Sequence, residues 1–185
     1  MATRTIVYSE DPILRESSTR IRRVTPDVED LIADMFETMR VNNGVGLAAV
    51  QVGVPLRVIT VEIPEDLEDP DAGTSLALIN PELARSSDEM EDGIEGCLSV
   101  PGWVGEVSRH HRVTVKAMDE RGKKVRVRAS GYLARVLQHE IDHLNGVLFI
   151  DLAKEMWPVT EGEEEAAEAQ AAGGEGGAGI EAFLE

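Results

Sequence analysis

Two histidines and a glutamate close together in the chain could form a catalytic metal site. His139 and His143 are four residues apart in the run Gln138-His139-Glu140-Ile141-Asp142-His143-Leu144. On a helix this spacing puts both imidazoles on one face, where they could bind a divalent ion such as zinc or ferrous iron. Glu140 directly follows the first histidine and could act as a base toward an attacking water. The pattern predicts metal-assisted hydrolysis, but a helix with two surface histidines and no metal could have the same sequence.

A hydrolytic metal needs a third protein ligand and one open position. In the extended protease pattern a third histidine lies six residues after the second, and Phe149 occupies that position here. Another protease class uses a downstream glutamate, for which Glu155 and residues 161 to 165 are the nearest supply. Cys97, the single cysteine of the chain, is the better candidate, because it has no disulfide partner and a thiolate binds such metals. The alternative for a lone thiol is a small buried side chain.

Three motifs together resemble the signature of the peptide deformylases. They occur in the family's order, and the similarity extends from about Ile6 to Asp151. The resemblance implies an enzyme that removes the N-formyl group from the initiator methionine of newly made bacterial-type chains and releases formate. The motifs are Gly44-Val45-Gly46-Leu47-Ala48-Ala49-Val50-Gln51, Glu95-Gly96-Cys97-Leu98-Ser99 and Gln138-His139-Glu140-Ile141-Asp142-His143-Leu144.

The resemblance also implies the cofactor and its ligands. Cys97, His139 and His143 are expected to hold one divalent metal ion, with Glu140 as the acid and base of the reaction. The family usually uses ferrous iron in the cell and accepts zinc or nickel in purified samples. One thiolate and two imidazoles suit all three metals, so the sequence does not choose among them.

Further residues are expected to contact the substrate. The side-chain amide of Gln51 and the backbone N–H of Leu98 would stabilise the negative charge that develops on the formyl oxygen. A packing turn with a surface glutamine is the alternative for the Gln51 segment. The expected lining of the methionine pocket is Val45, Gly46, Tyr132 and Val136.

Composition limits the possible partners and surroundings. A chain of 185 residues with 42% hydrophobic content predicts one domain with a core. The net charge of −17 disfavours direct binding to nucleic acid or to an anionic membrane. A single cysteine suits a reducing cytoplasm, and no apolar run is long enough to cross a membrane. The expected partners are N-formyl-methionyl nascent peptides, and docking on the ribosome stays open.

Two helices are expected. Apolar residues recur at helical spacing from Thr25 to Arg40, where Thr25 could cap the helix and Asn42-Asn43-Gly44 would end it. Ser130 could cap a second helix, which carries the two histidines and ends at Asn145-Gly146. Its buried stripe would be Leu133, Leu137, Ile141 and Leu144.

Several strands are also expected. Residues 58 to 63 and 76 to 79 read as strands, separated by an acidic loop from Glu65 to Gly73. Residues 113 to 117 and 125 to 129 alternate apolar and polar side chains around the turn Asp119-Glu120-Arg121-Gly122, which predicts an antiparallel hairpin. His110 and His111 are excluded from the metal site, because neighbouring strand residues point to opposite faces.

These expectations combine into an α+β fold of one domain, with short antiparallel and mixed sheets around a core helix that carries the His-Glu-x-x-His motif. Residues 1 to 159 would form the catalytic domain, and residues 160 to 185 an acidic, low-complexity tail. Two other functions stay open. One is a metalloprotease with a tail glutamate as third ligand, and the other is a non-catalytic protein with a closed structural zinc site.

Overall fold

The computed structural model describes residues 2 to 67 and 69 to 159, so the expected acidic tail lies outside the described residues. The architecture is α+β, as expected, with α-helices α1 (Pro26–Val41) and α2 (Gly131–His143). Short 3-10 helices are η1 (Pro12–Arg15), η2 (Ala49–Val52) and η3 (Phe149–Asp151). The strands are β1 (Gly46–Ala48), β2 (Val58–Glu62), β3 (Ser75–Ser86), β4 (Met90–Gly96), β5 (Trp103–His110), β6 (Arg112–Met118), β7 (Lys124–Ser130) and β8 (Met156–Pro158).

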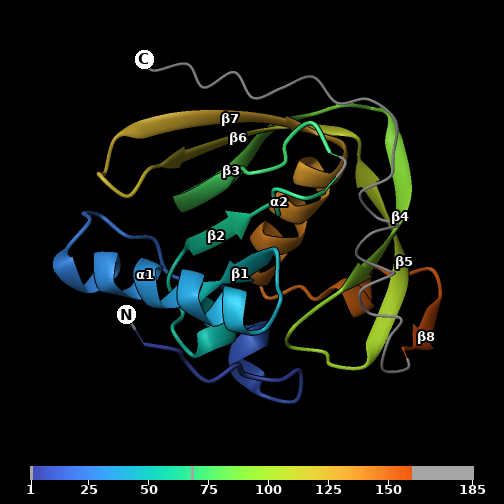
Figure 1. The fold of residues 1–185 in the computed structure, drawn as a ribbon, viewed down its shortest axis with the longest axis horizontal. Coiled ribbons are helices and arrows are strands. Elements are labelled where there is room, and N and C mark those ends of the chain that lie inside the picture. The colour runs from blue at the N-terminus through green and yellow to red at the C-terminus, as the bar shows by residue number, and fades with distance from the viewer. Residues whose placement is uncertain (1, 68, 160–185) are drawn as a thin grey trace.

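The strands form two sheets, with α2 in the middle of the molecule (Figure 1). One sheet has the order β1-β2-β3-β6-β7 and the other has the order β4-β5-β8. All pairs of named strands are antiparallel, and the parallel pairing described is an isolated bridge between Thr19 and Leu56. The expected hairpin is confirmed as β6 and β7, with Val115 opposite Val127 and a left-handed Gly122 in the turn.

Helices cover both faces of β2, which explains why its first four residues are all buried. Val58 and Ile79 belong to the apolar cluster that also contains the buried face of α1. Ile59 and Val61 belong to the other cluster, which contains the buried face of α2. Successive side chains of a strand point to opposite faces, so side chains on both faces of a strand between two helices are buried. The buried hydroxyl group of Thr60 donates a hydrogen bond to the Leu47 carbonyl oxygen.

The helix ends differ in detail from the prediction. Thr25 and Ser130 occupy the N-cap positions of α1 and α2, but neither side chain makes a capping hydrogen bond, so their predicted capping role is wrong. Pro26 stands in the first turn of α1, where no backbone donor is needed. At the other end, α1 stops at Val41, Asn42 is its C-cap and Asn43 is left-handed, so the predicted end of the helix is confirmed.

Besides β1, three strands were not predicted from the sequence, namely β4, β5 and β8. They form the second sheet, which carries Cys97 directly after β4. β3 continues to Ser86, well beyond the predicted residues 76 to 79, and its pairing with β6 is irregular near the left-handed Asn80. Among the described residues, neither helix is long and apolar enough to cross a membrane.

Candidate metal centre

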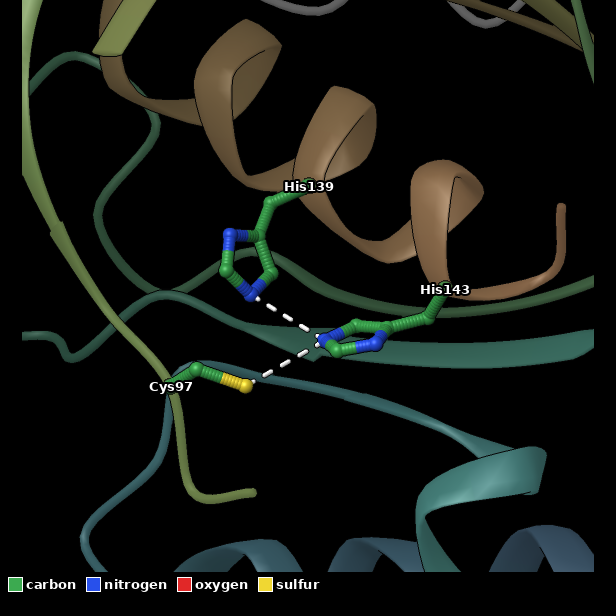
Figure 2. A group of neighbouring side chains, drawn as sticks. All are labelled: Cys97, His139 and His143. Atoms are coloured by element: carbon green, nitrogen blue, oxygen red, sulfur yellow. Dashed lines mark hydrogen bonds between the residues drawn. The ribbon is translucent and has the colours of Figure 1, made fainter. Parts of the chain in front are cut away.

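The structure brings the three predicted metal ligands together (Figure 2). His139 and His143 project from the same face of α2, and their Nε2 atoms are 3.2 Å apart. Cys97 approaches from the end of β4, and its Sγ lies 3.3 Å from His143 Nε2. All three ligand atoms lie within 4.8 Å of one another. The cluster therefore joins the second sheet to the core helix.

These three side chains fit a divalent metal ion. A zinc ion bound at about 2.0 to 2.3 Å in tetrahedral geometry holds its ligand atoms roughly 3.3 to 3.7 Å apart. Two of the three separations, 3.3 Å and 3.2 Å, are close to that range, and all three are within 4.8 Å. The cluster provides three protein ligands. Catalytic zinc sites usually have three protein ligands, whereas structural zinc sites have four.

Glu95 orients the first histidine, a role that the sequence analysis missed. Its Oε2 atom accepts a hydrogen bond of 2.9 Å from His139 Nδ1, which leaves Nε2 to face the cluster. The carboxylate also accepts hydrogen bonds from the buried guanidinium groups of Arg109 and Arg135. Burial alone would raise the pKa of Glu95, but the hydrogen bonds to Arg109 and His139 hold this pKa well below its usual range. The carboxylate is therefore ionised at neutral pH.

A signal for Glu95 was present in the sequence. Glu95 and Cys97 are two residues apart, and at this spacing strand residues point to the same face. A metal-binding histidine commonly donates its second N–H to a carboxylate. The Glu95-Gly96-Cys97 segment therefore contained both a candidate ligand and a candidate partner for a ligand.

The two histidines have different electrostatic surroundings. Burial alone would lower the pKa of His139, but hydrogen bonds to Cys97 and Glu95 hold it well above its ordinary value. Burial and the nearby charge of His139 lower the pKa of His143. The neighbours of His139 thus favour a positive charge at the cluster, which a metal ion would supply in place of the proton.

Glu140 is buried beside this cluster, and one of its oxygens has no partner. The side chain is 3% exposed, and Oε2 makes no hydrogen bond within the described part of the chain. Burial raises the pKa of Glu140 to about 7. The carboxylate lies against Gly46 of β1, since a methyl group built there would be 2.9 Å from Glu140 Cδ. The structure therefore places Gly46 in contact with the predicted base.

Gln51 also reaches the cluster. Its Oε1 accepts a hydrogen bond from the Ala48 N–H at 2.8 Å, which fixes the orientation of the amide. Its Nε2 is 3.4 Å from Cys97 Sγ and 3.2 Å from Ser99 Oγ, and the side chain is 1% exposed. The surface glutamine of the alternative reading is therefore excluded.

Leu98 follows the thiol directly and is partly buried against the α1 cluster. Its side chain passes close to Gly44, because a methyl group built there would be 2.8 Å from Leu98 Cδ1. Its backbone N–H makes no hydrogen bond to any described residue. This donor is therefore available beside the cluster.

The remaining predicted residues lie around α2. Tyr132 and Val136 are 8% and 6% exposed, and Val45 packs against the same apolar cluster. His110 Nδ1 contacts the Ser87 carbonyl oxygen, and His111 Nδ1 contacts the Glu91 carboxylate. Neither of these histidines belongs to the metal-binding cluster.

A buried glutamate beside two histidines and a cysteine is typical of a metal-dependent hydrolase. Residues 3 to 158 match the family model described as Polypeptide deformylase. The chain belongs to the peptide deformylase family, whose members are enzymes that remove the N-formyl group from newly made polypeptides.

Individual relatives agree with this assignment. The chain is 52% identical over 173 residues to a peptide deformylase of Thermomicrobium roseum, covering 91% of this chain and 98% of the relative. Among solved structures, the peptide deformylase of Ehrlichia chaffeensis in complex with actinonin has a TM-score of 0.78 and 39% identity, covering 90% of this chain and 94% of the other. That of Thermotoga maritima has a TM-score of 0.77 and 37% identity, with coverages of 84% and 100%.

Proposed function

We propose that Cys97, His139 and His143 hold one divalent metal ion and that this site hydrolyses the formamide bond of N-formyl-methionyl peptides. The observation that carries this proposal is the convergence of the three ligand atoms within 4.8 Å. A divalent ion held there acidifies water and polarises the formyl carbonyl group. Glu95 keeps the His139 ring oriented through the hydrogen bond to Nδ1.

Glu140 moves the proton in this scheme. Its carboxylate takes a proton from the attacking water while the water oxygen bonds to the formyl carbon. It then gives this proton to the amine nitrogen as the bond between carbon and nitrogen breaks. The products are formate and a peptide with a free amino terminus. The burial of Glu140 and its partnerless Oε2 support this role, because no other described group competes for the carboxylate.

Gln51 and Leu98 stabilise the negative charge on the formyl oxygen. The Gln51 amide is held by the Ala48 N–H and directs Nε2 toward the cluster, and the Leu98 N–H lies next to the thiol. Donors fixed before the reaction lower the barrier without reorganising during it. The residues that would contact the methionine side chain are Val45, Gly46, Tyr132 and Val136.

Membership of the family also supports proposals for the metal, the domain limits and the cellular location. We infer ferrous iron in the cell, with zinc or nickel as substitutes, because the ligand set suits all three. Residues 1 to 159 form the catalytic domain, and residues 160 to 185 form an acidic tail. Nascent-chain substrates place the enzyme in the cytoplasm of a bacterium. Co-sedimentation with ribosomes would test whether it also binds them directly.

A single ligand variant tests the proposed site. Cys97→Ala removes one of three protein ligands, so we expect metal content to fall sharply and formate release to fall with it. Ser99→Ala is the matched control, because it lies two residues away, contacts Gln51 and is no ligand. Metal analysis and formate release from a formyl-Met peptide are measured on the same samples. Stoichiometric metal of native affinity in Cys97→Ala would contradict the site and revive the protease alternative.

A further inference from the structure

One sheet face carries basic side chains beyond the area that α1 covers. Val58, Ile79 and Met118 are on the α1 side of the sheet, where they are in register across β2, β3 and β6. Beyond Met118, the residues of β6 and β7 on this face of the sheet are mostly exposed. We call this surface the basic face, and its exposed members are Arg85, Arg112, Lys116, Lys124, Arg126 and Arg128.

Like charges are directly opposite one another on the basic face. Lys116 pairs with Arg126, and Arg85 and Arg128 stand on either side of Thr114 in the next row. Like charges at directly opposed positions destabilise a sheet. Glu82 lies across from Lys116, but its carboxylate is paired with Arg20. Lys116 and Arg126 therefore oppose each other with no acid of the described residues paired to either.

The described part of the chain offers little neutralisation. Arg112 pairs with Glu89, but no ion pair joins Lys116, Lys124 or Arg126 to a described residue. This concentration of cations is unusual in a chain with 35 acidic and 18 basic residues. A surface of this kind fits a segment with several negative charges better than a single carboxylate.

The acidic segment at the end of this chain has the matching chemistry. Residues 160 to 185 contain eight glutamates and neither lysine nor arginine. The segment starts after β8, where the Val159 N–H donates to the Gly102 carbonyl oxygen. Fully extended, 26 residues span roughly 85 Å. A compact domain of about this size has a radius of gyration of about 15 Å, so the segment can reach any part of the surface.

We propose that residues 160 to 185 bind to the basic face of the same chain. Tethering gives the segment an effective concentration on the order of millimolar, whereas a free polyanion must approach a chain of net charge −17. The basic face and α2 are on opposite sides of the sheet, because Val113 and Val115 face α2 while Thr114 and Lys116 face away. The bound segment therefore leaves the metal centre open.

The test uses the full-length metal-loaded protein labelled with nitrogen-15. One variant replaces Glu163, Glu164, Glu165 and Glu168 with Gln, which removes charge without shortening the chain. At about 0.02 M salt we expect amide shift changes concentrated in β6 and β7, and these changes should disappear at about 0.5 M salt. The control, Glu10→Gln with Glu16→Gln, removes exposed acids from the opposite end of the chain and should leave the chemical shifts of these amides unchanged.

A second variant identifies the receiving surface. In a Lys116→Gln, Arg126→Gln background, neutralising the tail should no longer move the β6 and β7 amides, while formate release stays at the wild-type level. Unchanged β6 and β7 amides in the original tail variant would overturn the proposal. Shift changes that depend on protein concentration would indicate the tail of a second copy and would also overturn it. Polyuridylate that shifts these amides, when tail neutralisation does not, would assign the face to an external polyanion instead.

Discussion

The carboxylate of Glu140 is confined by a residue without a side chain. Gly46 on β1 leaves only the space that the carboxylate occupies, and the backbone of Gly46 is not left-handed. Glycine is needed at this position because the Glu140 carboxylate approaches the backbone closely, and not because the backbone has a special conformation. Gly46 was also expected to line the methionine pocket, and that role stays a prediction. The contact with Glu140 could not be predicted, because it joins residues 94 positions apart in the chain.

We predict that Gly46→Ala lowers turnover while the metal content stays normal. The added methyl group would overlap Glu140 Oε1 and force the carboxylate to move. A displacement of about 1 Å at a catalytic group can reduce the rate on the order of 10²-fold. Steady-state formate release and metal analysis are the measurements. Wild-type turnover in this variant would show that the position of Glu140 does not depend on Gly46.

At the scale of elements, Glu95 joins the β4–β5 hairpin to α2. It receives hydrogen bonds from Arg109 on β5, from Arg135 on α2 and from His139 on α2. Gly93 allows Arg135 to cross β4, since a methyl group there would be 2.7 Å from Arg135 Cζ. The hairpin that holds Cys97 is thus fixed to the helix that holds both histidines.

We predict that Glu95→Gln destabilises the metal-free protein by about 3 to 5 kcal/mol. Two buried guanidinium groups would lose the carboxylate that compensates their charge. The free energy of unfolding in urea is the measurement. Glu89→Gln is the control, because its pair with Arg112 is mostly exposed and should change stability by less than about 1 kcal/mol. Equal effects of the two substitutions would contradict a structural role for the buried network.

The sequence allowed α1, α2 and the β6–β7 hairpin to be predicted because each carries a regular apolar pattern. The β4 segment Met90-Glu91-Asp92-Gly93-Ile94-Glu95-Gly96 does not. Its acids and glycines are typical of a loop. The segment forms a strand that contacts residues distant in the sequence, such as Arg109 and Arg135. The candidate metal ligands could be proposed from the sequence motifs, whereas the contact of Glu95 with His139 depends on the tertiary structure.

At the scale of the whole molecule, the metal centre lies where the two sheets meet α2. The proposed ligands and catalytic groups come from η2, the segment after β4 and α2, all within residues 51 to 143. None of them lies in residues 160 to 185. The proposed mechanism therefore uses only residues of the described domain.

We predict that a chain ending at Thr160 deformylates a short formyl peptide at nearly the full-length rate. Every proposed ligand and catalytic residue is retained in this variant. Turnover and circular dichroism of both chains are the measurements. A large drop in turnover with the fold intact would favour a glutamate from residues 161 to 165 as a ligand, as the protease alternative requires.

The central claim is that Glu140 performs acid and base catalysis beside a metal held by Cys97, His139 and His143. Its most direct test is Glu140→Gln, with formate release and metal stoichiometry measured on the same preparation. Gln is nearly isosteric but cannot accept the water proton, so we expect full metal occupancy and a loss of turnover of ~10² to 10⁴ or more. Wild-type turnover in a fully metallated Glu140→Gln protein would contradict the claim.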